Sequence, residues 1–251
     1  MPARVRLDTL LHERGLVSSR TRGRTSVLAG LVRVDGRPAT KAGALVPTDA
    51  EVTLDAPDHP WVGRGGVKLA HALDAFGIQP DGAAALDVGA STGGFTDVLL
   101  RRGARAVVAL DVGRGQLDWR LRQDPRVRVL ERVHIGAVTP DDLPAGLRRF
   151  DVVTVDVSFI SIARFVDRLP ALLAAGGDLV ALVKPQFEAG RSEVRRGGLV
   201  TDPHVHERVV EGVAAAAAAV GLRRVATTPS PITGTKGNRE FFLHLRAACE
   251  A

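Results

Sequence analysis

Residues 87–97 read Asp-Val-Gly-Ala-Ser-Thr-Gly-Gly-Phe-Thr-Asp, and they follow a short apolar run over residues 84–86. An apolar run, a glycine-rich turn and a helical pattern, in this order, predict a β-strand that leads directly into an α-helix. In an open parallel sheet, ligands bind in the crevice beyond the carboxyl ends of the strands, and glycine lets the backbone approach a small molecule closely. We therefore expect a cofactor at this turn.

Three classes of cofactor use such a turn, and the spacing of its residues separates them. A dinucleotide fingerprint G-x-G-x-x-G requires glycine at the position of Ser91, and a P-loop requires a Gly-Lys-Ser/Thr tripeptide that occurs nowhere in the chain. S-adenosylmethionine carries no phosphate, so it needs close backbone approach and carboxylates instead of an anion site. Asp111 ends the next apolar run and can accept both ribose hydroxyls of an adenosine, while Asp87 can lie near a cationic sulfonium. An ordinary tight connection without a ligand is the alternative.

These features favour S-adenosyl-L-methionine as the cofactor. The candidate cofactor-binding residues are Asp87, Gly89, Ala90, Ser91, Thr92, Gly93, Gly94, Phe95, Asp111, Val112 and Asp156.

The composition is typical of a globular protein. Of the 251 residues, 45% are hydrophobic and 25% are charged. No apolar run is long enough to span a bilayer, and the N-terminus has no apolar secretory core, so we expect a cytoplasmic protein without a membrane partner. Cys249 is the only cysteine and lies in the C-terminal tail, which excludes disulfides, a cysteine-zinc site and a core thiol nucleophile. The histidines form no His-Glu-x-x-His pattern, His204 and His206 are expected at the surface, and no metal site is predicted.

Strand and helix patterns alternate through most of the chain, which is typical of an α/β fold with a doubly wound, mostly parallel sheet. The alanine-rich stretch 214–219, closed by Gly221, predicts one of the helices. Seven strands are predicted, over residues 84–88, 106–112, 127–130, 152–157, 178–183, 223–228 and 241–245.

Residues 1–55 have a pattern of their own. Between Arg4 and Asp55, nine basic residues stand against six acidic ones. Leucines at positions 7, 10, 11 and 16 have helical spacing, Ser18 or Ser19 can cap a second helix, and the stretch around Asp35-Gly36 predicts a strand that enters a tight hairpin.

Four short motifs in this region resemble the small RNA-binding domain of ribosomal protein S4: Arg6-Leu-Asp8, Arg14-Gly-Leu16, Ser19-Arg20 and the hairpin over residues 32–37. The resemblance implies a small α+β RNA-binding domain whose arginines contact phosphates without reading base sequence. A solvated basic face on a small helical domain is the alternative. The candidate RNA-binding residues are Arg4, Arg6, Arg14, Arg20, Arg22, Arg24, Arg37 and Lys41.

A short stretch separates this region from the strand and helix pattern. Residues 56–63 contain Pro57 and Pro60, which cannot sit inside a helix, so we predict a stiff linker there and a second domain over residues 64–251. Trp61, near the end of the linker, is expected to fill the junction between the domains.

The basic residues are almost all arginine. Of 34 lysines and arginines only four are lysine, at positions 41, 68, 184 and 236. Lysine can lose its proton, which arginine cannot, so each lysine is a candidate for chemistry that arginine cannot perform. Lys184 and Asp156 each end an apolar strand, Glu240 begins the last strand, and Lys68 starts the helix that leads into the second domain. Because these positions converge at one edge of the sheet, the four residues are candidate catalytic groups, with a structural salt-bridge network as the alternative.

Taken together, five segments closely resemble the TlyA family, whose members are similar to FtsJ-like RNA ribose methyltransferases. The segments are residues 87–97, 109–117, 156–161, 184–187 and 237–241. One departure lies at residues 131–136, where relatives usually carry Glu-Arg-Thr-Asn-x-Arg and this chain has Glu-Arg-Val-His-Ile-Gly.

The resemblance implies a Rossmann-like class I methyltransferase fold and transfer of methyl from S-adenosylmethionine to the 2′-hydroxyl of cytidines in 16S and/or 23S ribosomal RNA. It also implies a Lys-Asp-Lys-Glu tetrad, which falls on Lys68, Asp156, Lys184 and Glu240. Ribosomal RNA or ribosomal subunits are therefore the expected partners, and the oligomeric state stays open. Two other classes remain as alternatives, a non-catalytic ribosome-assembly factor and a haemolysin, a label that this family has carried.

Overall fold

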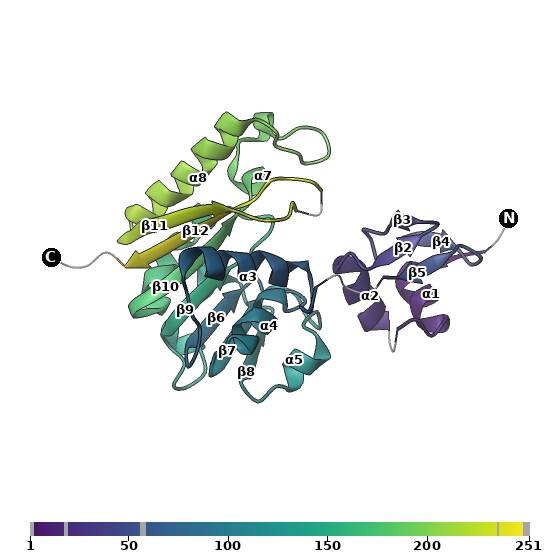
Figure 1. Ribbon diagram of the computed structural model, residues 1–251, viewed down its shortest axis with the longest axis horizontal. Helices are drawn as coiled ribbons and strands as arrows, with labels where there is room; N and C mark the ends of the chain where they lie inside the picture. The colour runs from purple at the N-terminus through teal and green to yellow at the C-terminus, as the bar shows by residue number, and fades with distance from the viewer. Residues whose placement is uncertain (1–2, 18–19, 56–58, 235, 248–251) are drawn as a thin grey trace.

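The computed structural model describes residues 3–17, 20–55, 59–234 and 236–247. Ser18, Ser19, Cys249 and part of the predicted linker, residues 56–58, lie outside the described residues. The structure has a small N-terminal domain and a larger α/β domain, each with its own hydrophobic core, and the two follow one another along the long axis of the molecule (Figure 1).

The N-terminal domain is built from short strands and two helices, α1 (Leu7–Glu13) and α2 (Arg20–Leu28). Asp35 (φ 49°) and Gly36 (φ 74°) both have positive φ, as a type I′ turn requires, and so the predicted hairpin is confirmed. The core contains Leu7, Leu11 and Val32. One antiparallel sheet pairs β1 (Arg4–Arg6) with β4 (Leu45–Pro47), and another holds β2 (Val32–Val34) between β3 (Arg37–Pro38) and β5 (Val52–Leu54).

The larger domain contains a seven-stranded sheet in the order β11-β12-β10-β9-β6-β7-β8. Strands β6 to β10 are parallel to one another, and β12 runs antiparallel to both of its neighbours. The prediction of a doubly wound, mostly parallel sheet is therefore confirmed. The strands are β6 (Ala84–Val88), β7 (Ala106–Asp111), β8 (Val127–Glu131), β9 (Phe150–Val155), β10 (Leu173–Val183), β11 (Leu222–Pro229) and β12 (Phe241–Ala247).

Helices cover both faces of this sheet, because successive residues of a buried strand point to opposite sides. In β6, Ala85 joins one core with helices α3 (Arg64–Phe76), α4 (Gly94–Arg101) and α5 (Trp119–Gln123), while Leu86 joins the other core. The second core is closed by α8 (Pro203–Ala218) and by the short helices that precede β10, including α6 (Leu169–Leu172).

Strand β9, predicted over residues 152–157, spans Phe150–Val155, so Asp156 lies just after it. Two further details differ from the sequence predictions. Strand β10 begins at Leu173, which pairs with Phe150 before an irregular stretch, and regular pairing starts only at Asp178, where the strand was predicted. His206 is buried, and its Nε2 lies 2.9 Å from the carbonyl oxygen of Val200, so its expected surface position was wrong. Its place in α8 lies on the face that carries the core valines, whereas His204 is exposed as predicted.

The order of the strands creates a crevice at one position of the sheet. Strands β6 and β9 are neighbours, but the chain continues from β6 to β7 on one side and from β9 to β10 on the other. Ligands of doubly wound sheets bind at such a switch point, beyond the carboxyl ends of the strands. The glycine-rich turn follows β6 and Asp156 follows β9, so both lie at this place.

Neither a membrane helix nor a metal site is found in the part of the chain that the structure describes. None of its helices combines the length and the apolar character needed to cross a membrane. No group of three or more His, Cys, Asp or Glu residues in the same ranges is placed to hold a metal ion.

Candidate active site

The turn after β6 lies directly against the end of β9. Gly89 has φ 85°, and a Cβ on this residue would lie 2.3 Å from the carbonyl oxygen of Asp156. The amides of Gly89 and Ala90 both donate to the carbonyl oxygen of Leu110, at 2.8 and 3.1 Å, which holds the turn between the two neighbouring strands. Glycine at position 89 is therefore required for backbone conformation and for space.

Close packing of two helices brings Lys68 to the same place. A Cβ on Gly94, the first residue of α4, would lie 2.9 Å from the amide nitrogen of Gly66 in α3. The absence of side chains at this contact lets the amino ends of the two helices approach each other. Lys68, two residues after Gly66, is consequently buried beside the glycine turn.

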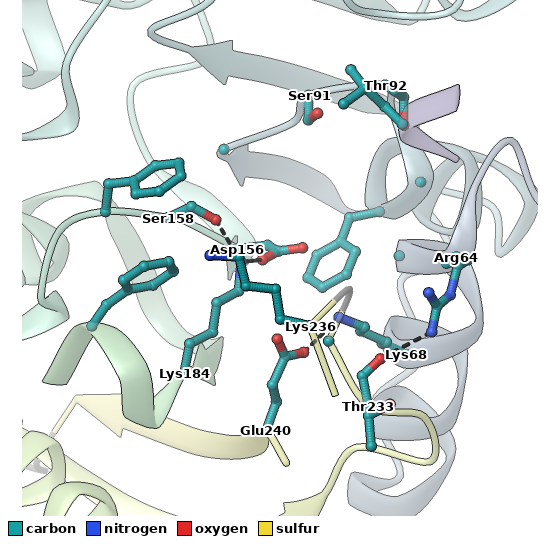
Figure 2. Close-up of a pocket in the computed structure, with 18 of the residues that line it drawn as sticks. Arg64, Lys68, Ser91, Thr92, Asp156, Ser158, Lys184, Thr233, Lys236 and Glu240 are labelled. Atoms are coloured by element: carbon teal, nitrogen blue, oxygen red, sulfur yellow. Dashed lines mark hydrogen bonds and ion pairs between the residues drawn. The ribbon is translucent and has the colours of Figure 1, made fainter. Parts of the chain in front are cut away.

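A cavity of about 390 Å³ opens above the turn (Figure 2). Its wall includes residues from both domains. The predicted cofactor residues Gly89, Ala90, Ser91, Thr92, Gly94, Phe95 and Asp156 line it, whereas Asp87, Gly93, Asp111 and Val112 do not. The N-terminal domain contributes Leu28 and Ala29 from the end of α2.

The four predicted catalytic residues lie together in the wall of this cavity as two ion pairs. Lys68 Nζ lies 2.5 Å from Glu240 Oε2, and Lys184 Nζ lies 2.5 Å from Asp156 Oδ1 (Figure 2). Lys184 also donates to Ser158 Oγ at 3.0 Å. Asp156 Oδ1 is buried against this lysine, and its second lone pair can accept a further hydrogen bond.

A third lysine lines the same cavity. Lys236, from the segment before β12, belongs to the wall together with Lys68 and Lys184, while Lys41 lies in a groove of the N-terminal domain. Lys68 and Lys184 were predicted for this site and line the cavity, whereas the sequence did not place Lys236 there.

Three further cavity residues were missed by the sequence analysis. Phe159 is 90% exposed, has φ 68°, and its ring centroid lies 5.1 Å from that of Phe187. Gln186 presents a buried side-chain oxygen without a hydrogen-bond partner. All three residues lie inside or beside the quoted motifs, but no sequence pattern gives the positive φ that turns Phe159 outward.

Asp111 lies at the end of β7, as predicted, beside the outer part of the turn. Its Oδ2 accepts from the amide of Ser91 at 2.8 Å, and its Oδ1 accepts from the amide of Gly113 at 2.6 Å. A carboxylate oxygen has a second lone pair, so Asp111 can still accept a ribose hydroxyl. Val112, the next residue, is 64% exposed and faces neither this carboxylate pocket nor the large cavity.

Asp87 lies beneath the turn rather than in the cavity. Its carboxylate is fully buried and accepts from Thr96 Oγ1 at 2.6 Å and from Thr154 Oγ1 at 3.1 Å. Burial raises the pKa of Asp87 to about 7, with a further contribution from the nearby Asp156, although both threonines favour the charged form. Asp87 therefore changes charge near neutral pH directly below the proposed cofactor site.

The segment that departs from the family pattern keeps one structural function. His134 Nδ1 accepts a hydrogen bond from the amide of Gly136 at 3.0 Å and so caps the short helical turn at residues 135–137. An asparagine at this position could provide the same acceptor.

The predicted RNA-binding residues fall into two groups. Arg6, Arg20, Arg24 and Lys41 line one groove of about 790 Å³, which we call the basic groove and which also contains Leu28. Because Leu28 lines the large cavity as well, the basic groove and the cavity are adjacent. Arg4, Arg14, Arg22 and Arg37 do not line the groove.

Two residues of the second group have defined contacts inside the protein. Arg14 donates to the carbonyl oxygens of Ala50 and Thr48, each at 2.7 Å, and so holds the N-terminal domain together. Arg22 pairs with Asp118 of the larger domain.

Trp61, from the described part of the predicted linker, packs on the larger domain. A Cβ on Gly66 would lie 2.3 Å from the Cβ of Trp61, and the guanidinium of Arg101 lies 5.5 Å from the centre of the indole ring.

Comparison with protein families gives two matches. The model of FtsJ-like methyltransferases matches residues 61–247, and that of the S4 domain matches residues 5–52. The chain is 47% identical over 247 residues to the 16S/23S rRNA (cytidine-2′-O)-methyltransferase TlyA of Mycobacterium tuberculosis, which covers 98% of this chain and 91% of that protein. It is 39% identical to Hemolysin A of Brachyspira hyodysenteriae, over 96% of this chain and 99% of that protein.

Comparison with solved structures also finds a relative that is similar over the full length of this chain. A protein from Streptococcus thermophilus, named as a hemolysin, superimposes with a TM-score of 0.76 and 40% identity, over 100% of this chain and 90% of that chain. The similarity to these proteins therefore covers nearly the whole chain. It includes the glycine turn, the two lysine-carboxylate pairs and the small N-terminal domain. The chain belongs to the TlyA family of FtsJ-like methyltransferases.

Proposed function

We propose that this protein transfers a methyl group from S-adenosylmethionine to the 2′-hydroxyl of cytidine in ribosomal RNA, in the cytoplasm. The proposal rests on two lysine-carboxylate contacts, Lys68 with Glu240 and Lys184 with Asp156. Both lie in the cavity beside the glycine turn. The M. tuberculosis relative carries this activity in its name.

The residues of the cavity fit the cofactor. The missing side chain of Gly89 lets the turn pack against the carbonyl oxygen of Asp156, so that backbone lines the cavity at this point. Gln186 Oε1 is a buried acceptor without a hydrogen-bond partner. Residues 89–95 would hold the methionine part and Asp111 the ribose. When bound, S-adenosylmethionine would supply a methyl group on a positively charged sulfur; the methyl carbon would bond to the acceptor oxygen, and the sulfur would keep the electron pair of the broken bond.

The chain's own residues would handle the proton of the acceptor. A ribose hydroxyl is a weak nucleophile, so a base must take its proton as the oxygen forms the new bond. Lys184 in its neutral amine form would accept that proton, and Asp156 would stabilise the ammonium that results. Lys68 and Glu240 would orient the hydroxyl, and fixed alignment of donor and acceptor would supply much of the acceleration.

The RNA would reach this site along the basic groove. Arg6, Arg20, Arg24 and Lys41 would bind phosphates, and Leu28 marks the point where the groove meets the cavity. Phe159, exposed at the rim beside Phe187, would stack on an unpaired base, since single-stranded bases bind on aromatic side chains.

The proposal is tested by transfer of labelled methyl from S-adenosylmethionine to unmodified 16S and 23S rRNA and to ribosomal subunits. Lys184→Ala is expected to lower the rate by about 100-fold or more, the usual contribution of a general base. Arg149→Ala changes an exposed basic residue at the opposite end of β9 and is expected to leave the rate unchanged. Absence of transfer by wild-type protein that binds both cofactor and rRNA would instead favour a ribosome-assembly factor.

A further inference from the structure

The segment between β7 and α5, residues 113–118, contacts both domains, and we call it the 113–118 loop. On one side it is fixed to the glycine turn, because the amide of Asp118 donates to the carbonyl oxygen of Thr92 at 3.1 Å. The side chain of Leu117 packs on Gly93, where a Cβ would lie only 2.8 Å from its Cδ1. The position of the loop therefore determines the position of the turn that the cofactor would contact.

The carboxylate of Asp118 connects the loop to the N-terminal domain. Only 3% of Asp118 is exposed, and it pairs with Arg22, which lies in α2 of the N-terminal domain. Asp118 is also the N-cap residue of α5. Its Oδ1 accepts from the backbone amide of Arg120 at 2.9 Å and from Arg120 Nε at 3.2 Å. Burial acts to raise the pKa of Asp118, but the hydrogen bonds from Arg120 and the charge of Arg22 outweigh it, so the pKa lies below the usual value.

A second contact joins the same two elements. Residues of α2, among them Thr25 and Leu28, line a cavity of about 230 Å³ together with Gly115 and Gln116 of the loop. Gln116 also lines the pocket of Asp111, and its Oε1 lies 3.4 Å from Ser91 Oγ. The side chain of Gln116 thus lies between the N-terminal domain and the carboxylate expected to bind the cofactor ribose.

The positive charge of Arg22 compensates part of the negative charge of the buried Asp118 in this loop. A buried carboxylate is costly unless it is paired, and removal of Arg22 would leave Arg120 to compensate the charge of Asp118. Without Arg22, Asp118 would gain by moving toward water, and this movement would pull its amide away from Thr92.

We propose that Arg22 is a positioning residue for the methyltransferase site: by pairing with Asp118 it holds the 113–118 loop against the glycine turn, so that cofactor affinity depends on the N-terminal domain even without RNA. The inference rests on the proposed function in that it names the same cofactor site. It assigns Arg22 a contact between domains, in place of the RNA contact expected from the sequence.

The test is a calorimetric titration of the full-length protein with S-adenosylhomocysteine, without RNA. Arg22→Ala is expected to weaken binding by about fivefold or more, the lower end of measured couplings between sites. Arg33→Ala is the control, because Arg33 pairs with an aspartate of its own domain, Asp55, and this pair is partly exposed and does not involve the larger domain. Its affinity is expected to equal that of the wild type.

Two further measurements separate this role from general stability. Arg22→Lys keeps a positive charge and is expected to recover part of the affinity. Asp118→Asn keeps the acceptor for the amide of Arg120, and its combination with Arg22→Ala is expected to bind no more weakly than Asp118→Asn alone. Amide hydrogen exchange in the 113–118 loop is expected to be faster in Arg22→Ala than in Arg33→Ala, both without cofactor.

Unchanged affinity in a folded Arg22→Ala variant would overturn the inference and leave the proposed function intact. Additive effects of Arg22→Ala and Asp118→Asn would also overturn it, since they would exclude coupling through the pair. Absence of binding to the wild type would instead overturn the proposed cofactor, and the inference with it.

Discussion

Asp87 has a carboxylate that is fully buried below the glycine turn, held by Thr96 and Thr154. Its pKa of about 7 in the folded protein lies above the value of about 4 for an unfolded aspartate. The folded state therefore binds the proton more tightly, and this group stabilises the fold fully below about pH 4 and loses that contribution as the pH rises to about 7.

The variant Asp87→Asn tests this account, since it removes the titration and keeps an acceptor for one threonine. The free energy of unfolding of the variant, relative to wild type without cofactor, is expected to increase between pH 5 and pH 8. Urea unfolding at both pH values measures the difference. An equal difference at the two pH values would show that Asp87 does not titrate in this range.

Phe159 is the exposed aromatic residue at the rim of the cavity. Loss of a stacking platform costs about 1–3 kcal/mol per base, so Phe159→Ala is expected to reduce methyl transfer by about fivefold or more. Phe159→Trp is expected to retain most of the activity, because it keeps an aromatic face. Cofactor affinity, measured without RNA, is expected to stay the same in both variants, and its loss would argue against a role in RNA binding.

At the scale of elements, the turn between β6 and α4 depends on the missing side chain of Gly89. Gly89→Ala adds the penalty of positive φ, about 1–2 kcal/mol, to a collision with the carbonyl oxygen of Asp156. Gly82→Ala is the control, because Gly82 has φ 67° but no atom within 4 Å of an added Cβ. Urea unfolding and S-adenosylhomocysteine titration are expected to show a larger loss of stability for Gly89→Ala and a loss of affinity in that variant alone. Equal effects of the two substitutions would show that the close approach to β9 is unimportant.

The elements of the larger domain could be predicted because their signals are local. The buried strands β6 and β7 are short continuous apolar runs closed by glycine or aspartate, and their predicted bounds agree with the structure to within one residue. His206 shows the limit of this approach, since its burial depends on which face of α8 meets the core, and the alanine-rich sequence does not define that face clearly.

The candidate site could be predicted in part for the same reason. Asp156, Lys184 and Glu240 lie at strand ends, and the carboxyl ends of parallel strands meet at one edge of the sheet. The pairing of Lys68 with Glu240 joins residues 172 positions apart, and no local pattern specifies which carboxylate meets which lysine.

At the scale of the whole molecule, the N-terminal domain lies beside the larger domain (Figure 1). It adds the basic groove next to the cavity. Removal of one phosphate-binding side chain is expected to reduce the slope of log K against log salt concentration by about one. Arg24→Ala and Lys41→Ala are therefore expected to weaken binding to ribosomal RNA and to lower this slope, independently of base sequence. Filter binding between low and moderate salt measures the slope, and Arg149→Ala is the control because it changes an exposed basic residue outside the groove. An unchanged slope in both groove variants would show that the RNA does not bind in the basic groove.

Contacts between the domains were beyond the reach of the sequence. Arg22 lies in a helix rich in arginine, and composition alone cannot distinguish an arginine that contacts RNA from one that pairs with a buried carboxylate 96 positions away. Such a pair exists only because the two domains are folded and placed against each other.

The central claim is that the acceptor atom is a ribose oxygen of cytidine. Unmodified ribosomal subunits would be methylated with labelled S-adenosylmethionine and purified protein, the rRNA digested to nucleosides, and the products identified by mass spectrometry. The account predicts 2′-O-methylcytidine as the labelled nucleoside, formed at least about 100-fold more slowly when Lys184→Ala replaces the wild type. Label on a base, or on the ribose of another nucleoside only, would contradict it.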